Sequence, residues 1–298
     1  MPTVTRLNLV ALLFVAACSN PAPEDGAESA TGSIVGGRRA TSFEEVALVD
    51  TSSFLCSGAV IAPHLVLTAG HCVHGASSWT VTTPYAGGQR ARATRRWTAY
   101  VDAGDSVDPD SNDVAVLFLD TPIVLAQYPT LARSAVPSGT KATNVGRIHD
   151  GRASSSDLFV GRPVTLRPGS ASGWRFAYVS DEIIEEGDSG GPVYTADAAH
   201  QLVAVNSGGG DGSQLLARVD LAFDRIRGFI EADGAPQGEA PGGAGGCWSP
   251  TLGSDVEEGG CVQSASSRVW FQCHAGEWYR GGDADSGAHG ACTSSHPL

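Results

Sequence analysis

Short apolar runs separated by turn residues fill the chain from position 34 to about position 220. Each run is four to six residues long and is bounded by polar residues, glycine or proline. This length and spacing are typical of the strands of an all-β barrel or sandwich. The expected strands are 45–49, 57–61, 65–68, 79–82, 114–119, 163–166, 202–205 and 215–219.

One segment at the end of this region has a helical period instead. Its apolar residues recur so that they fall near one face of a helix over about 221–232. Asp220 precedes the segment, and we expect its carboxylate to cap the N-terminus of the helix. The residues of the apolar face are Leu221, Ile226, Phe229 and Ile230.

The first residues are typical of an export signal. Arg6 gives a positive start, and the apolar run 7–17 has signal-peptide length and is too short to span a bilayer. The run ends in VAAC at 15–18, which resembles the bacterial lipobox, whose cysteine is lipidated and becomes the new N-terminus. We therefore expect a signal peptide over 1–17 and lipidation of Cys18; the alternative is an ordinary signal peptide cleaved nearby.

Two segments of small, polar and proline-containing sequence delimit the remaining parts of the chain. Residues 18–33 are expected to form a lipidated tether and propeptide, and residues 233–246 a Gly/Pro/Ala linker. The module 247–298 holds four of the seven cysteines, so we expect disulfides to stabilise it. With lipid on Cys18, six cysteines remain, an even number that can pair in an oxidising compartment.

Composition and charge narrow the function classes. Of the 298 residues, 42% are hydrophobic and 17% charged, the profile of a globular protein. The formal net charge of −13 argues against nucleic acid as a partner.

The sequence GDSGGP at 187–192 is the strongest motif for chemistry. A serine hydroxyl becomes a nucleophile only when a base takes its proton, and the oxyanion formed by its attack needs hydrogen-bond donors. Gly187 allows a backbone turn that directs its own N–H and that of Ser189 into one oxyanion hole. The motif therefore predicts Ser189 as a nucleophile.

Two further motifs supply partners for this serine. His71 stands in LTAGHC at 67–72, after an apolar strand, and a Cys56–Cys72 disulfide would close the hairpin beneath it. We expect His71 to be the general base.

Asp113 abuts an apolar run in SNDVAVL at 111–117, where a carboxylate is costly to bury unless it is paired. Orientation of the imidazole by Asp113 provides that pairing.

These motifs, in the order His, Asp, Ser, resemble the trypsin/chymotrypsin family over about 34–232. The resemblance implies two antiparallel six-stranded β-barrels with the triad at their junction and a C-terminal helix. It also implies a serine endopeptidase that hydrolyses protein or peptide substrates through an acyl-enzyme, without a cofactor or metal. The rival hypothesis is a non-catalytic binding protein.

The sequence IVGG at 34–37 matches the N-terminus that members of this family expose on zymogen cleavage. In the family its amine pairs with the aspartate before the catalytic serine, here Asp188, and this ion pair orders the oxyanion loop. Ser33 precedes Ile34, so a trypsin-like activator would not cut there and the activating protease is unknown. Cleavage would also separate the protease from Cys18 and release it from the membrane, unless the C-terminal module binds a surface partner.

The specificity pocket departs from the family pattern. The resemblance places Ile183 at the base of the pocket, which argues against Arg or Lys as the preferred residue and for a small or medium apolar one. An insertion or deletion would instead place Asp181 there. The same resemblance assigns the pocket walls to Ser207, Gly208, Gly209 and Gln214. Other departures are Gly70, where the family more often has Ala, and the absence of cysteines from the second barrel.

In the module, segments 261–264 and 269–273 predict a β-hairpin. Four cysteines permit three pairings, of which we favour Cys261–Cys273 with Cys247–Cys292. Trp248, Trp270 and Trp278 either form a small core or bind a surface or glycan ligand. Zinc is not expected, because the spacings lack a CxxC pair.

Overall fold

The computed structural model describes residues 37–102, 107–197, 200–233, 247–249, 252, 254–257, 259–263, 269–274 and 277–280. The chain divides into two units, Met1–Thr31 and Gly32–Leu298, and every described residue belongs to the second. The predicted signal peptide, tether, lipidation site at Cys18, Ser33–Ile34 junction, linker from 234 to 246 and Cys292 lie outside the described residues.

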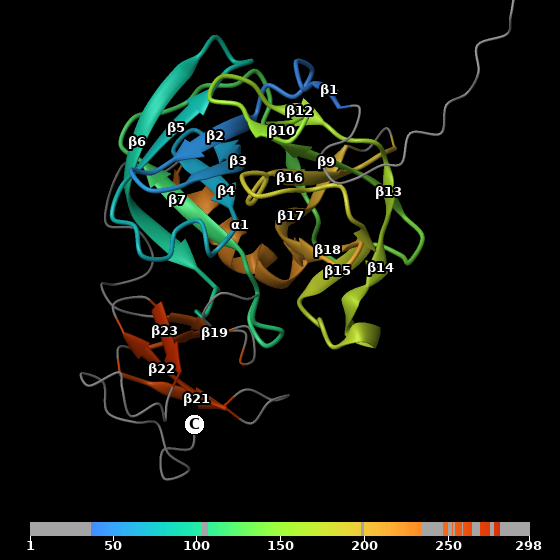
Figure 1. Ribbon diagram of the computed structural model, residues 1–298. Helices are drawn as coiled ribbons and strands as arrows, with labels where there is room; N and C mark the ends of the chain where they lie inside the picture. Colours follow the sequence, from blue (N-terminus) through green and yellow to red (C-terminus); the bar gives the residue numbers. More distant parts are fainter. Residues whose placement is uncertain are drawn as a thin grey trace, which may run out of the picture. The chain divides into compact units, whose positions relative to one another are not determined.

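Six antiparallel strands form a closed barrel in the first half of the chain, coloured blue to green in Figure 1. β2 pairs with both β3 and β5, which closes the ring. The side chains of β5 alternate between buried and partly exposed, as expected where one face of a strand meets a barrel core. The strands, in barrel order, are β2 (Val46–Asp50), β3 (Leu55–Ala62), β4 (Leu65–Thr68), β7 (Ala115–Leu119), β6 (Gln89–Thr98) and β5 (Trp79–Thr83).

Nine strands that follow the first barrel in sequence and the N-terminal strand β1 form a ten-stranded sheet, whose central strands curve into the second barrel. The path β13-β9-β16-β17-β18-β15 returns on itself, because β13 contacts β15. Among the described strands of this sheet, β8 and β17 are the one parallel pair. The strands are β1 (Arg38–Arg39), β8 (Thr130–Leu131), β9 (Lys141–Gly146), β12 (Phe159–Val160), β13 (Val164–Thr165), β14 (Arg167–Pro168), β15 (Ala177–Asp181), β16 (Pro192–Thr195), β17 (Gln201–Gly210) and β18 (Ser213–Arg218). This is the predicted chymotrypsin-like fold.

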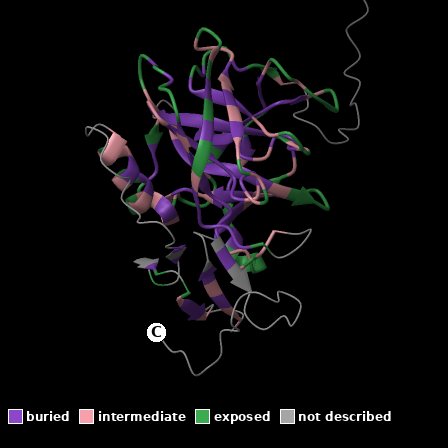
Figure 2. Ribbon diagram, turned by 90° about the vertical axis from the view of Figure 1, so that its left-hand side faces the viewer, coloured by how far each residue is buried: buried purple, intermediate pink, exposed green. Residues whose placement is uncertain are grey.

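Short elements complete the two barrels. β10 (Ile148–His149) and β11 (Arg152–Ala153) form a hairpin after β9, and η1 (Gly169–Ser172) precedes β15. Figure 2 shows that buried residues, in purple, concentrate on the strands, while exposed residues lie mostly at loops and turns. No helix among the described residues is long and apolar enough to cross a membrane.

The predicted helix is present as α1 (Phe223–Asp233), preceded by the 3-10 turn η2 (Asp220–Ala222). Ile226 and Phe229 are buried, and Phe229 packs edge-on against Phe118 of the first barrel. The expectation that Asp220 caps the helix is wrong. Its carboxylate instead accepts hydrogen bonds from the guanidinium of Arg218, two residues earlier.

The C-terminal region contains two small sheets. β19 (Cys247–Ser249) pairs with β20 (Ser254–Val256), and β22 (Trp270–His274) lies between β21 (Cys261–Gln263) and β23 (Glu277–Arg280). The predicted hairpin is therefore confirmed. Trp278 is buried in the apolar cluster of this region, whereas Trp270 is partly exposed.

The disulfides of this region correct the predicted pairings Cys261–Cys273 and Cys247–Cys292. Cys247 is bonded to Cys273, and Cys261 is also disulfide-bonded. The strand register explains the error: Cys261 lies opposite Gln272, so the next residue, Cys273, points to the other face of the sheet.

Candidate active site

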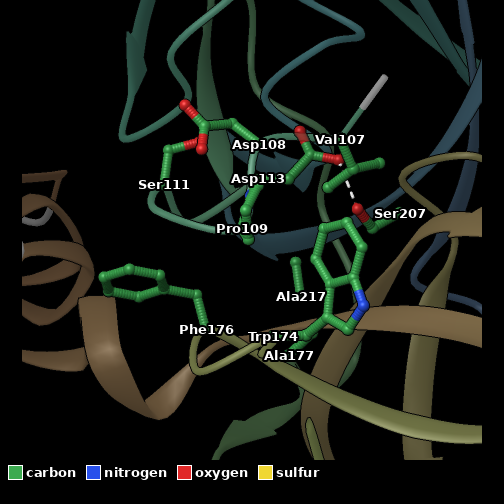
Figure 3. Close-up of a pocket in the computed structure, with 10 residues that line it drawn as sticks. All are labelled: Val107, Asp108, Pro109, Ser111, Asp113, Trp174, Phe176, Ala177, Ser207 and Ala217. Carbon is green, nitrogen blue, oxygen red and sulfur yellow. Dashed lines mark hydrogen bonds between the residues drawn. The ribbon is translucent and has the colours of Figure 1, made fainter. Parts of the chain in front are cut away.

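His71 and Asp113 lie side by side at the edge of the first barrel. His71 follows β4 and Asp113 precedes β7, and the two strands are neighbours. The imidazole Nδ1 is 2.7 Å from Asp113 Oδ2, and the backbone N–H of His71 donates to Oδ1 at 2.8 Å. Ser207 Oγ donates a further bond of 2.6 Å to Oδ2, drawn as a dashed line in Figure 3. The carboxylate is thus buried but fully paired.

These contacts set the ionisation of both groups. Burial acts to raise the pKa of Asp113, but the charge and hydrogen bonds of His71 and the bond from Ser207 hold that pKa below its ordinary value. Burial acts to lower the pKa of His71. The charge and hydrogen bond of the Asp113 carboxylate have the larger combined effect, and they raise this pKa above its ordinary value. With Asp113 ionised, Nδ1 carries the proton and Nε2 is free to accept one.

Gly70 makes room for Tyr100 behind the imidazole. A Cβ built on Gly70 would collide with Cβ of Tyr100, and the Tyr100 ring meets the His71 ring edge-on, with centroids 6.3 Å apart. The departure from Ala at position 70 therefore has a steric cause. Sequence reasoning missed Tyr100, although an unexplained glycine beside the candidate general base His71 was a signal for such a neighbour.

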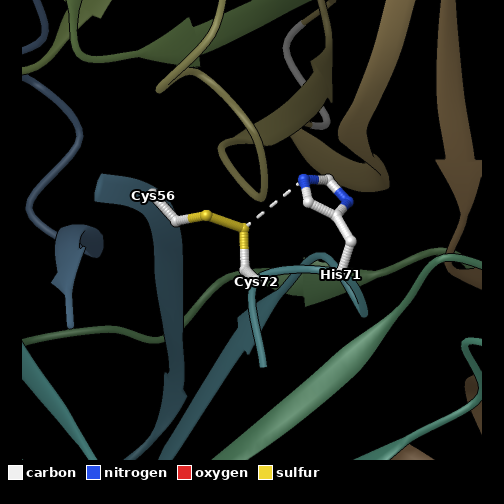
Figure 4. A group of neighbouring side chains, drawn as sticks. All are labelled: Cys56, His71 and Cys72. Atoms are coloured by element: carbon white, nitrogen blue, oxygen red, sulfur yellow. Dashed lines mark hydrogen bonds between the residues drawn. A yellow bond between two sulfur atoms is a disulfide. The ribbon is translucent and has the colours of Figure 1, made fainter. Parts of the chain in front are cut away.

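The loop that carries Ser189 packs against the first barrel. The N–H of Ser57 donates to Ser189 O at 2.8 Å, and Ser57 Oγ donates to Gly187 O at 3.1 Å. Gly187 has a φ of 107°, a conformation that favours glycine. Within the described residues Ser189 Oγ makes no hydrogen bond to the imidazole. His71 Nε2 lies 3.8 Å from Cys72 Sγ. A dashed line marks this contact in Figure 4.

Cys56, His71 and Cys72 form a group of potential metal ligands. The two sulfur atoms, however, are bonded to each other in the predicted Cys56–Cys72 disulfide. Neither is a thiolate, the form that binds metal ions. This group is therefore a disulfide beside a histidine rather than a metal centre.

Asp188 is buried beneath the loop. Its Oδ1 accepts the N–H of Ile148 at 2.8 Å and its Oδ2 accepts the N–H of Glu185 at 3.0 Å. A side chain at Gly146 would collide with this carboxylate. Burial raises the pKa of Asp188 to about 7, despite the opposing effect of these backbone bonds. Ile34, its expected partner, lies outside the described residues.

Two of the proposed pocket residues are held in the protein interior. Ile183 is buried among apolar side chains, and its N–H donates to Gln214 Oε1 at 2.9 Å. Gln214 is also buried and donates to Ser180 Oγ at 2.9 Å. The alternative base residue, Asp181, has an exposed side chain 3.8 Å from the guanidinium of Arg167.

Two side chains cover the glycines of the pocket wall. A Cβ on Gly208 would lie 2.8 Å from Val107 Cγ2, and one on Gly209 would lie 2.6 Å from Glu182 Oε1. Glu182 also accepts the N–H of Gly212 at 3.0 Å. Sequence reasoning missed Glu182, although its place next to Ile183 marked it as a neighbour of the pocket.

A hollow opens beside Asp113 and Ser207 (Figure 3). Its walls include the rings of Trp174 and Phe176 and the side chain of Val107. The recess is apolar, and its volume of about 10 Å³ leaves room for little more than one water molecule.

Comparisons with known proteins agree with this geometry. The pattern of the family described as Trypsin matches residues 34–226. Trypsin iota of Drosophila melanogaster is 29% identical over 204 residues, covering 60% of this chain and 79% of that protein. A mutant of human heparin binding protein shares the fold at a TM-score of 0.55 and 23% identity, covering 69% of this chain and 100% of that one. Mouse neuropsin, a serine protease, shares it at a TM-score of 0.54 and 17% identity, covering 64% and 97%. The chain belongs to the trypsin family of serine proteases.

Proposed function

We propose that this chain is a serine endopeptidase with His71, Asp113 and Ser189 as its catalytic triad. The observation that carries the proposal is the 2.7 Å hydrogen bond between His71 Nδ1 and Asp113 Oδ2. It leaves Nε2 unprotonated, as a general base requires. The 2.8 Å bond from Ser57 to Ser189 O supports it, because it ties the loop of the nucleophile to the barrel of the base.

The reaction proceeds through an acyl-enzyme. Ser189 Oγ attacks the carbonyl carbon of the scissile peptide while His71 Nε2 takes the hydroxyl proton. The N–H groups of Gly187 and Ser189 stabilise the oxyanion. The imidazolium then protonates the departing amine, which leaves an ester on Ser189. Water, deprotonated by the same Nε2, hydrolyses that ester and regenerates the hydroxyl.

We also propose that the intact chain is a zymogen, activated when an unidentified protease cuts before Ile34. The buried Asp188, whose pKa is raised to about 7, supports this, because such a carboxylate gains from a cationic partner. The α-amine of Ile34 is that partner. In the uncut chain the backbone N–H groups of Ile148 and Glu185 are the partners proposed to hold the Asp188 carboxylate.

The export signal and Cys18 extend this proposal to localisation. The intact chain is lipid-anchored to the cell envelope, and cleavage before Ile34 releases the active enzyme. No cysteine other than Cys18 lies between 18 and 33, so no disulfide retains the propeptide. Fractionation, with N-terminal sequencing and active-site labelling of each pool, tests it. A lipid-modified pool that labels as strongly as the soluble pool would defeat it.

For specificity, we propose a small or medium apolar residue at the scissile bond rather than Arg or Lys. Ile183 supports this, since it offers no charge for a buried cation. A cleavage profile on a peptide library tests it. A profile dominated by Arg and Lys would overturn it, and Glu182, which lies on Gly209, would then be the source of the charge. Glu182→Gln would separate the two cases, because only a charge-dependent profile would change.

The C-terminal module is proposed to bind a surface or glycan ligand through aromatic residues, with the partly exposed Trp270 as the candidate. A polyanion such as the heparin named for one structural relative is disfavoured, because the net charge is −13.

Labelling by a fluorophosphonate, which bonds covalently to an activated serine, tests the peptidase itself. The experiment compares protein cut before Ile34 with the same protein carrying Ser189→Ala. We expect labelling of the first and none of the second. Absence of labelling in the cut wild-type protein would favour the non-catalytic binding protein.

A further inference from the structure

One arginine side chain crosses from the second barrel into the first. Arg147 directly follows β9, and its side chain is completely buried. Its Nη2 donates to Asp50 Oδ1 at 2.7 Å and to Cys56 O at 2.6 Å. Both acceptors belong to the first barrel, on β2 and β3. The guanidinium is therefore a direct polar connection between the two barrels.

The stem of the same side chain lies beside Gly187, in the loop before Ser189. A Cβ built on Gly187 would lie 3.5 Å from both Cγ and Cδ of Arg147. The next residue, Ile148, donates its N–H to Asp188 Oδ1 at 2.8 Å. Arg147 thus lies beside Gly187, and Ile148 is hydrogen-bonded to Asp188; these are the two residues that precede Ser189.

The other end of the connection leads to the catalytic base. Cys56, whose carbonyl Arg147 binds, is disulfide-bonded to Cys72, the neighbour of His71. Ser57, the residue after Cys56, donates through its N–H to Ser189 O. The hydrogen bond from Arg147 Nη2 to Cys56 O therefore connects the loop that carries Ser189 with the segment that is disulfide-bonded next to His71.

Stabilisation of the fold does not by itself explain why an arginine occupies this buried position. Nε and Nη1 are buried without a hydrogen-bond partner among the described residues. Leaving buried donors unpaired costs free energy, and an apolar side chain of similar volume often serves at least as well in a core. What an apolar side chain does not supply is the directional contact with Asp50 and Cys56 O.

We propose that Arg147 is a positioning residue that holds the Gly187–Ser189 loop in register with His71. It acts through Asp50 and Cys56 on one side and Gly187 on the other, and it does not touch the substrate. This inference rests on the proposed peptidase function. Because catalysis needs the hydroxyl, the imidazole and the oxyanion donors aligned together, a loosened connection lowers kcat more than it raises KM.

The test compares Arg147→Met, Arg147→Lys and Asp50→Asn in the enzyme cut before Ile34. Arg227→Met is the matched control, since Arg227 pairs with Asp224 and Glu231 on the surface of α1. The measurements are kcat, KM, the rate of fluorophosphonate labelling and the melting temperature. We expect Arg147→Met to lower kcat and the labelling rate at least tenfold with KM within threefold, and Arg147→Lys to retain an intermediate kcat.

The outcomes separate this inference from the proposed function. No labelling of the wild-type enzyme would refute the peptidase. Labelled wild type, with an Arg147→Met variant whose kcat is within twofold of it, would refute only the role of Arg147, whatever the melting temperature. If Arg147→Met does not fold, Asp50→Asn decides: we expect at least a threefold loss of kcat, and an unchanged kcat would overturn the proposal.

Discussion

Ser207 Oγ donates a 2.6 Å hydrogen bond to Asp113 Oδ2, the carboxylate oxygen that also faces His71 Nδ1. Ser207→Ala would remove one of the bonds that hold the pKa of Asp113 below its ordinary value and would loosen the orientation of the imidazole. We expect kcat to fall about tenfold, the worth of one charge-assisted hydrogen bond. Steady-state kinetics on a peptide substrate check this. Ser207→Thr keeps the hydroxyl and is the control; equal activity of the Ala and Thr variants would contradict the prediction.

The pH dependence of activity follows from the raised pKa of His71. The imidazole acts as a base only when neutral, so kcat/KM should be lost as the pH falls through a midpoint above the ordinary value of 6.5. Asp113→Asn removes the carboxylate that raises this pKa. We expect its midpoint to move to lower pH and its kcat to fall by on the order of 10³ to 10⁴. An Asn variant with the wild-type midpoint would show that another group controls the profile.

Gly70 should not tolerate a side chain, because a Cβ there meets Tyr100. We expect Gly70→Ala to destabilise the protein by about 1 to 3 kcal/mol, the usual range for overpacking. Combining it with Tyr100→Gly should recover part of that loss. Gly228→Ala in α1 is the control, since a Cβ there meets nothing and alanine favours helix. Urea denaturation measures five proteins: the wild type, Gly70→Ala, Tyr100→Gly, their double variant and Gly228→Ala. Equal costs for Gly70→Ala with Tyr or Gly at position 100 would exclude the clash.

Asp188 should make the uncut chain less stable as the pH rises. Its pKa is about 7 when folded against an ordinary value of 3.8, so the folded chain binds this proton more tightly. Its contribution is fully present below pH 3.8 and is lost as the pH rises through about 7, with a slope of at most about 1.4 kcal/mol per pH unit.

Melting temperatures of uncut Ser189→Ala protein between pH 4 and 8, with and without Asp188→Asn, isolate this contribution. The Asn variant should show a flatter profile. After the cut before Ile34 the slope should also weaken, because the amine compensates the charge. Identical profiles with and without Asp188→Asn would show that Asp188 does not titrate in this range.

The strands with alternating or continuous apolar residues were predictable from sequence, and 65–68 has the same bounds in the structure. β6 was not predicted, because its sequence QRARATRRWT is dominated by polar side chains on the outer face of the barrel. The pairing of Cys247 with Cys273 was not predictable either, since it depends on which face of a strand each cysteine occupies.

The residues of the candidate site also include some that the sequence could identify and some that it could not. Motifs identified His71 and Asp113 because their chemistry is local and their neighbouring residues are distinctive. Arg147 and Glu182 carry no motif. Their positions arise from contacts with Asp50 and Gly209, which are far away in sequence and meet only in the folded barrels.

The Cys247–Cys273 disulfide also affects how the C-terminal region responds to cleavage by proteases. It closes a ring between residues 26 positions apart, which includes the whole of β20 and β21. A single backbone cut inside that ring leaves both fragments covalently joined, so the nicked region keeps its mass until a reductant is added. The disulfide therefore lets the C-terminal region stay covalently attached to the rest of the chain after a single cut inside the ring.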